Sequence, residues 1–277
     1  MAPSLLTRSA LRWITLQRAV KRVTAYVINV SNTRSLKPIA IKNIIYLINL
    51  DKSKFIIRFV EMNTLAEENY LKSIYHLSLN AENVSTNQLA AFINTKASSV
   101  TDMLKKLSDK DLINYTPYQG VTLTAAGEKI AVNIIRKHRL WEYFLVEKLD
   151  FKWDEVHEMA EEMEHISSNE LIDRLDKFMG YPKYDPHGDP IPDCNGLFKV
   201  HNLKPVSAIS VNESGVICGV RNHSTPFLQY LEKQALTIGK KITVSEIIDF
   251  DHSVILQSEG KQLQISREVA NNLLIGV

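Results

Sequence analysis

The chain has 277 residues, of which 45% are hydrophobic and 23% charged, and this is the composition of a globular protein. It excludes collagen-like, coiled-coil and disordered chains, and no apolar run reaches the roughly 18 residues that cross a bilayer. The formal net charge of +2 hides an asymmetry: residues 1–61 carry a net charge of +9, and the other 216 residues carry −7. Two cysteines are too few for a disulfide framework, so we expect a reducing compartment.

The basic stretch of residues 1–61 differs in composition from everything that follows it. Three interpretations compete: a transit peptide, a small extra domain, or upstream sequence translated from a start codon placed too early. Met62 opens a helical pattern at the point where the charge balance changes, which favours a mis-assigned start or a disordered extension. We therefore leave this stretch out of the fold prediction and expect a chain that begins at Met62 to keep its function.

Residues 62–124 have the pattern of a winged helix-turn-helix. A first helix is expected after Thr64, and a short second helix is expected after Ser85. A third helix carries one apolar stripe with helical spacing, and two short strands around Pro117 follow it as a hairpin wing. The stripe consists of Val100, Met103, Leu104 and Leu107.

The opposite face of the third helix is small, polar and cationic, which fits insertion into the major groove of DNA. Hydroxyl and amino groups on such a helix can reach phosphates and base edges. An ordinary three-helix subdomain remains the alternative, because the net charge of residues 62–124 is only −1 and supplies no broad basic field. The candidate DNA-contacting residues are Thr86, Lys96, Ser98, Ser99, Thr101, Lys105, Lys106 and Tyr118.

Histidine and carboxylate side chains gather on two predicted helices after Thr124. His138 and Glu142 lie four residues apart on the first of these helices, and Asp154 is expected to cap the second. Residues 125–190 hold 15 acidic and nine basic side chains, a density that is costly near a core unless a cation binds. A solvated acidic helix face is the alternative. On the second helix, one stripe of about 100° holds His157, Glu161, Glu164 and His165.

This donor set suits Mn, Fe, Zn, Co or Ni, because it combines imidazole and carboxylate without thiolate. Catalytic motifs match poorly. Residues 157–161 miss the zincin pattern at its last position, residues 162–165 supply only one of the two Glu-x-x-His copies of a di-iron bundle, and no nucleophile elbow or phosphate loop is present. We predict that the protein is not an enzyme. A metal-independent winged-helix regulator, a dinuclear metalloenzyme and a metal carrier remain rival interpretations.

From Ala66 to the C-terminus, the sequence resembles the diphtheria toxin repressor and manganese transport regulator family of metal-dependent transcriptional repressors. No single segment of the sequence is specific for this family, but six segments together are. The segments that carry the resemblance are residues 69–75, 98–101, 123–127, 136–142, 157–165 and 186–192.

The resemblance implies two metal sites in each subunit. The ancillary site would use His138, Glu142 and His157, with His223 as an extra ligand, and the primary site would use Glu161, Glu164 and His165, with Asn69 from the first helix. Asn69 stands where iron-type members have Met and manganese-type members have Asp. Glu161 replaces the Cys of iron-type members, and this hard oxygen donor favours Mn²⁺ over Fe²⁺ as the cofactor.

The implied fold is mainly α with small β elements. It comprises a winged helix-turn-helix (62–124), a helical metal-binding and dimerisation domain (125–190), a Pro-rich linker (191–205) and an SH3-like β-barrel (206–277). The implied function is that of a cytoplasmic, bacterial-type homodimer that represses metal-uptake genes. It would bind a palindromic operator in double-stranded DNA when loaded with metal, without a membrane or small-molecule substrate. Because ligand histidines must be neutral, we expect activation to weaken below about pH 6.

Overall fold

A computed structural model describes residues 44–51, 54–61, 63–117, 119–199 and 202–276, in two compact units. The first unit, Met1–Asn63, contains an antiparallel pair formed by β1 (Ile44–Asp51) and β2 (Lys54–Glu61). The basic stretch therefore includes a hairpin, although residues 1–43 lie outside the described residues. The second unit, Thr64–Val277, holds every helix described below.

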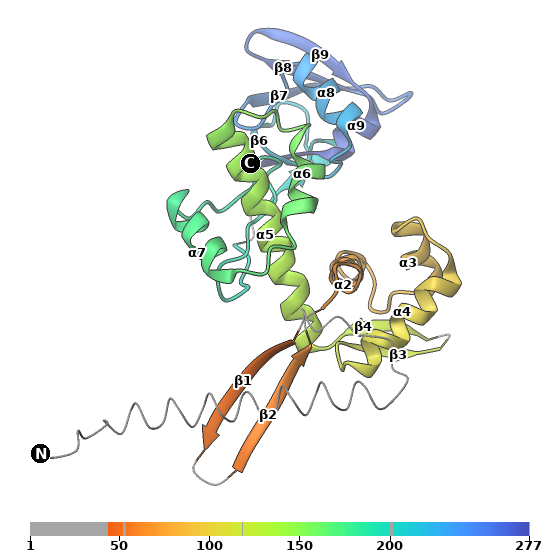
Figure 1. Ribbon diagram of the computed structural model, residues 1–277. Helices are drawn as coiled ribbons and strands as arrows, with labels where there is room; N and C mark the ends of the chain where they lie inside the picture. Colours follow the sequence, from red (N-terminus) through yellow and green to blue (C-terminus); the bar gives the residue numbers. More distant parts are fainter. Residues whose placement is uncertain (1–43, 52–53, 62, 118, 200–201, 277) are drawn as a thin grey trace, which may run out of the picture. The chain divides into compact units, whose positions relative to one another are not determined.

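The second unit begins with a winged helix-turn-helix (Figure 1). Its helices are α2 (Leu65–Ser78), α3 (Thr86–Phe92) and α4 (Ala97–Asp109), and its wing is β3 (Ile113–Thr116) with β4 (Gly120–Leu123). Thr64 and Ser85 each form a capping box that fixes the start of a helix. The predicted stripe on α4 is buried at Val100, Leu104 and Leu107, as its helical spacing requires.

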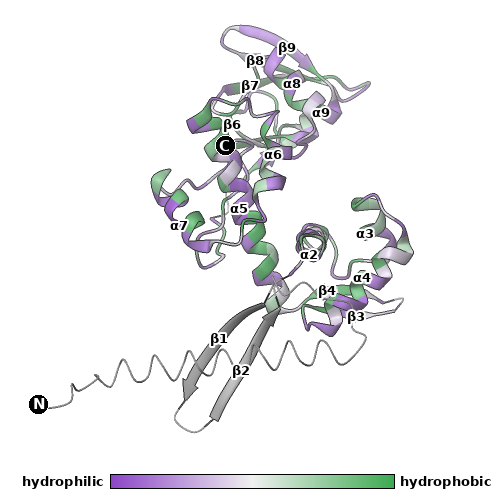
Figure 2. Ribbon diagram, viewed as in Figure 1, coloured by the Kyte–Doolittle hydropathy of each residue, from purple (hydrophilic) through white to green (hydrophobic). Residues whose placement is uncertain are grey.

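Helix α5 (Ala125–Leu149) joins the DNA-binding part to the helical part of this unit. Its first turn is capped by the Thr124 hydroxyl, which accepts a hydrogen bond from the Gly127 amide. A mostly apolar stretch at residues 130–135, interrupted by Asn133, precedes a basic band at residues 136–139, and both are visible along α5 in Figure 2. The helix packs against α2 and β4 and then against α6 (Val156–Met163) and α7 (Asn169–Phe178).

Helix α6 is shorter than the sequence pattern suggests. Glu155, and not Asp154, occupies its N-cap position, and the Asp154 carboxylate accepts a hydrogen bond from Gln229 instead. Glu164 is the C-cap, so Glu164 and His165 lie on the turn after the helix. Of the four ligands predicted on one helical stripe, His157 and Glu161 therefore lie on α6, whereas Glu164 and His165 lie on the turn that follows it.

The C-terminal part is a six-stranded antiparallel sheet that curls around one apolar core. In sheet order its strands are β5 (Lys204–Pro205), β10 (Leu273–Gly276), β6 (Ser214–Val220), β7 (Lys241–Ile247), β8 (Val254–Ser258) and β9 (Lys261–Ile265). Two helices, α8 (Thr225–Lys233) and α9 (Arg267–Asn272), and a short 3₁₀ helix (Val206–Ala208) complete it. Among the described residues, no helix has the length and apolar character needed to cross a membrane.

Candidate metal centre

Three donor atoms converge where α5 packs against α6. His138 Nε2 lies 3.0 Å from Glu142 Oε1 and 3.2 Å from His157 Nδ1, and His157 Nδ1 lies 3.2 Å from Glu142 Oε1. Donors that each lie about 2.1 Å from one ion are about 3.0–3.4 Å apart, so these distances fit a shared divalent cation. The structure thus brings together the three residues predicted for the ancillary site.

The two inner residues of this cluster are buried and strongly coupled. Burial opposes ionisation of Glu142, but its contacts with His138, His157 and His187 hold its pKa well below the ordinary value. Burial also lowers the pKa of His138, yet hydrogen bonds to Glu142 and Glu164 outweigh burial and raise this pKa to about 9. The second ring nitrogen, His138 Nδ1, lies 2.6 Å from Glu164 Oε2, an outer contact that fixes the ring as such contacts do for metal-bound histidines.

A second cluster, which the sequence pattern did not predict, lies on the other side of Glu142. The donor atoms of Glu142, Asp185 and His187 lie within 4.8 Å of one another, and all three residues are buried. Residues 186–192 carried the family resemblance, but nothing in their spacing showed that a loop 43 residues after Glu142 folds back onto it. The signal available was the density of Asp and His in that loop.

His187 offers the clearest sign that this second cluster can accept a cation. Its Nε2 lies 2.8 Å from the carbonyl oxygen of Trp153, to which it donates whether or not the second ring nitrogen is protonated. Its Nδ1 is buried without a hydrogen-bond partner and lies 3.5 Å from Glu142 Oε2. Burial and the neighbouring carboxylates of Asp189 and Glu142 raise the pKa of Asp185 to about 7, although Arg139 Nε lies 3.6 Å from its Oδ2. A divalent cation would satisfy both groups.

His223 lies next to this second cluster. Its ring stacks on His187 with centroids 4.8 Å apart, and its Nε2 is buried without a hydrogen-bond partner, 3.9 Å from Asp189 Oδ2. Burial lowers the pKa of His223, which leaves a neutral ring suited to metal binding. His223 precedes α8, so the sheet domain reaches the helical domain at this point.

Gly188 makes this approach possible, because a Cβ atom there would lie 2.0 Å from the Cys218 carbonyl oxygen on β6. The Gly188 backbone also has a φ of +88°, which side-chain-bearing residues rarely adopt. One residue earlier, the His187 carbonyl accepts a hydrogen bond from the Val220 amide. Strand β6 therefore holds the loop that carries Asp185 and His187.

We predict that Gly188→Ala lowers the free energy of unfolding by about 2–4 kcal/mol and weakens metal binding at the second cluster. Gly180→Ala is the matched control, since Gly180 has a φ of +78° but nothing within 4 Å of its added Cβ. The control should cost only about 1 kcal/mol. Denaturant unfolding and metal titration measure both effects, and equal losses in the two variants would contradict the role given to Gly188.

The residues predicted for the primary site come together only in part, with His165 Nε2 3.6 Å from Glu164 Oε1. Glu161 is half exposed, whereas the Glu164 side chain is fully buried and both its oxygens contact Lys72 Nζ, at 2.7 and 2.9 Å. The ring of His165 turns toward α2, where its Nδ1 lies 2.7 Å from Glu68 Oε2. Asn69 is exposed, and the α2 carboxylate that contacts His165 comes from the residue before it.

The predicted DNA-contacting residues lie on or near the start of α4, with some exceptions. Lys96 is the N-cap without a side-chain hydrogen bond to the helix, and Ser98 and Ser99 are exposed. The Thr101 hydroxyl donates to the Ala97 carbonyl, and Lys105 pairs with Asp102 at 3.6 Å. Lys106 is exposed further along α4, Thr86 is the half-buried first residue of α3, and Tyr118 lies outside the described residues.

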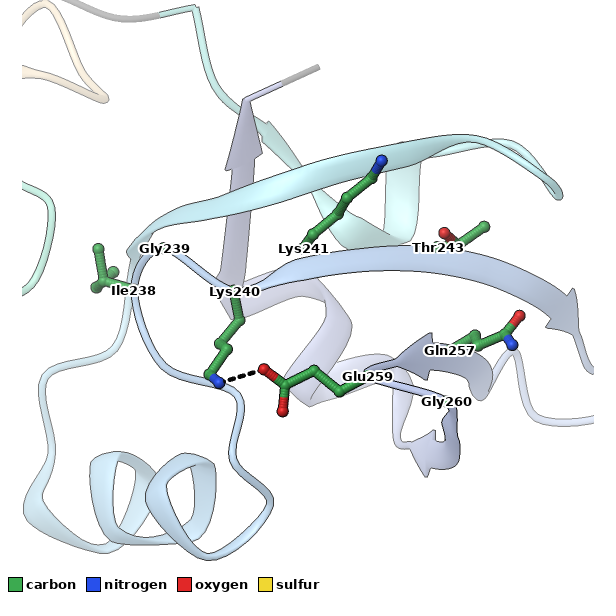
Figure 3. A pocket seen from close by; sticks show the side chains of 8 residues that line it. All are labelled: Ile238, Gly239, Lys240, Lys241, Thr243, Gln257, Glu259 and Gly260. Atoms are coloured by element: carbon green, nitrogen blue, oxygen red, sulfur yellow. Dashed lines mark hydrogen bonds and ion pairs between the residues drawn. The ribbon is translucent and has the colours of Figure 1, made fainter.

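A hollow of about 600 Å³ on the sheet domain is not a second metal centre (Figure 3). Its lining includes one carboxylate, Glu259, which pairs with Lys240, and no histidine or cysteine. A cation at this place would meet two lysines and a neutralised acid. Among the described residues, the histidine and carboxylate groups that could hold a metal gather around α5, α6 and the 185–190 loop.

A winged helix-turn-helix joined to buried histidine and carboxylate clusters defines a metal-responsive DNA-binding regulator. Comparison with known protein families supports this class of protein. Residues 62–121 match the N-terminal DNA-binding domain of iron-dependent repressors, residues 124–193 match their metal-binding and dimerisation domain, and residues 204–276 match the FeoA domain. The chain belongs to the iron-dependent repressor family.

Individual relatives support this assignment. An uncharacterized HTH-type transcriptional regulator of Methanocaldococcus jannaschii is 41% identical over 113 residues, which are 40% of this chain and 90% of that protein. The iron-dependent repressor IdeR of Mycobacterium tuberculosis is 31% identical over 133 residues, 47% of this chain and 58% of IdeR. The solved structure of the manganese regulator SloR is 35% identical, covers 76% of this chain and 97% of its own, and has a TM-score of 0.62.

Family membership confirms the resemblance, the fold class and the expectation of a regulator that is not an enzyme. Members of the family are metal-dependent transcriptional repressors that bind operator DNA as dimers, with the metal as cofactor. The ligand residues and the domain boundaries of this chain stay predictions.

Proposed function

We propose that this chain is a homodimeric, cytoplasmic repressor of metal-uptake genes that binds a palindromic operator when loaded with a divalent metal, Mn²⁺ before Fe²⁺. Each subunit has two metal sites. The ancillary site uses His138, Glu142 and His157, and we extend it to the neighbouring cluster of Asp185 and His187, with His223 beside it. The primary site uses Glu161, Glu164 and His165.

The convergence of His138 Nε2, Glu142 Oε1 and His157 Nδ1 carries this proposal. Imidazole and carboxylate donors without thiolate favour harder divalent ions, and Glu161 adds another oxygen donor. Solved structures of relatives include a manganese regulator and a repressor with bound Cd²⁺ or Zn²⁺, so metal availability also decides which ion is bound.

DNA binding in this proposal uses α4, whose exposed first turn carries Lys96, Ser98 and Ser99 and no acidic residue. The free backbone amides and the hydroxyls of such a turn suit phosphate and base contacts. The winged domain has no broad positive field, so affinity depends on these few contacts and falls as the salt concentration rises.

Dimerisation in this proposal uses the helices of residues 125–180. Two large apolar side chains of α7 are exposed, Leu171 and Phe178, the latter with 68% of its surface accessible. A second copy that covers this surface would bury both. The dimer must place its two α4 helices about 34 Å apart to reach successive major grooves.

The test selects duplexes from a random DNA pool with Mn²⁺ and then measures affinity by fluorescence anisotropy with Mn²⁺ and with chelator. We expect selected sites to be palindromic and the affinity to fall about 5- to 150-fold with chelator. Variants with Ala at both Lys96 and Lys106 should bind weakly under both conditions. Equal affinity with and without metal would contradict the proposal and support a metal-independent regulator.

A further inference from the structure

The side chain of Lys72 on α2 contacts the carboxylate of Glu164, a predicted ligand of the primary site. Its ammonium lies 2.7 Å from Glu164 Oε1 and 2.9 Å from Oε2, and 3.6 Å from Glu161 Oε1. The ammonium therefore lies against two of the four predicted primary ligands. The sequence pattern by itself assigns no role to Lys72.

The contact between Lys72 and Glu164 is mutually exclusive with metal binding at the same oxygens. A divalent ion lies about 2.0–2.2 Å from a carboxylate oxygen, so it would take the position of an ammonium that contacts both oxygens. Glu164 Oε2 also accepts from His138, and the Glu164 side chain is fully buried, so no unused face of the carboxylate points to solvent. The lysine must leave before a metal can enter.

Two predicted primary ligands, the Glu164 carboxylate and the His165 imidazole, both contact residues of α2. Glu68, four residues before Lys72 and one turn away on α2, contacts His165 at 2.7 Å. Because α2 packs in the core of the DNA-binding domain, these two contacts join that domain directly to Glu164 and His165.

We propose that Lys72 is a built-in competitor of the metal at the primary site, and that its release from Glu164 sets the metal concentration at which that site loads. The inference rests on the proposed function, since it requires Glu164 to bind metal. Replacing the ammonium with an uncharged side chain of similar length removes the competitor and also a like charge next to the bound cation. Both effects should increase the affinity of the primary site for metal.

The test titrates the full-length chain with Mn²⁺ and follows the free ion by electron paramagnetic resonance. Glu161→Gln first shows which binding step belongs to the primary site. Lys72→Met should then tighten that step about tenfold or more, equivalent to about 1.4 kcal/mol, whereas Lys72→Arg should leave it near the wild-type value. If Lys72→Met does not fold, Lys72→Gln replaces it.

Lys110→Met is the matched control, because Lys110 pairs at 3.0 Å with Glu67, another buried carboxylate of α2 away from the predicted ligands. This variant should leave every Mn²⁺ step unchanged. Thermal unfolding adds a second readout: excess Mn²⁺ should remove the stability loss caused by Lys72→Met but not the loss caused by Lys110→Met.

Two results would overturn the inference in distinguishable ways. If Lys72→Met binds Mn²⁺ at the primary step as wild type does, or more weakly, then Lys72 is not a competitor and the proposed function stands. If no Mn²⁺ step of the wild-type chain responds to Glu161→Gln, then the primary site itself is wrong and the inference falls with it.

Discussion

Replacing Glu142 with glutamine should abolish metal binding at both clusters around α5, with at least a 100-fold loss of affinity, on the order expected when a ligand is lost together with its support of neighbouring ligands. Glu142 is 2% exposed, and its two oxygens face different partners: Oε1 faces His138 and His157, and Oε2 faces His187. An amide keeps the size of the side chain but supplies neither the charge nor two acceptor atoms.

Glu147→Gln is the control for this variant, because Glu147 is an exposed acid on the same helix. Metal content by mass spectrometry and Mn²⁺ affinity by calorimetry should match wild type in the control. Operator affinity of Glu142→Gln should no longer respond to Mn²⁺. Unchanged metal affinity in Glu142→Gln would mean that the buried histidine and carboxylate cluster is only structural.

Metal affinity should rise steeply with pH between about 6 and 9. The pKa of His138 is about 9 and that of His187 is about 9; in both, burial lowers the pKa but the contact with Glu142 outweighs it. Both rings are therefore protonated at pH 7 before metal binds, and each must lose its proton to act as a ligand. Affinity should increase about tenfold per pH unit for each released proton and level off above about pH 9. This window lies above the pH 6 expected from an unperturbed histidine.

The same pKa values predict the opposite trend for stability without metal. A histidine whose folded pKa is raised contributes stability that is fully present below its unfolded pKa of about 6.5 and is lost as the pH rises through about 9. Chelated protein should lose thermal stability from pH 7 to 9 while Mn²⁺ affinity increases. Calorimetry in buffers of different ionisation enthalpy counts the released protons, and affinity that is independent of pH would exclude these histidines as ligands.

The elements with local signals were predictable from the sequence. Capping residues such as Thr64, Ser85 and Thr124 start helices where the pattern placed them, and the stripe of α4 faces the core. The pairing of His138 and Glu142 was also predictable, since these residues lie one helical turn apart on α5, whereas the family resemblance supplied His157. Local spacing determines these features, so one sequence suffices.

Features that depend on contacts between distant segments were not predictable. Glu164 and His165 lie on the turn after α6, where Lys72, His138 and Glu68 contact them from other helices. The second cluster depends on the loop of residues 185–190, which can approach strand β6 because residue 188 is a glycine. Helical periodicity contains no information about either.

The uneven charge that the composition shows was determined by the sequence alone: a basic first 61 residues and an acidic remainder with most of its negative charge in residues 125–190. The sequence also determined that this acidity comes with imidazole and without thiolate, and so which class of cation it suits. Only the tertiary structure decided which carboxylates converge with histidines and which one, Glu164, contacts a lysine. The physical reason is that charge density is a sum over residues, whereas coordination needs donor atoms within a few ångströms, and that distance is set by packing.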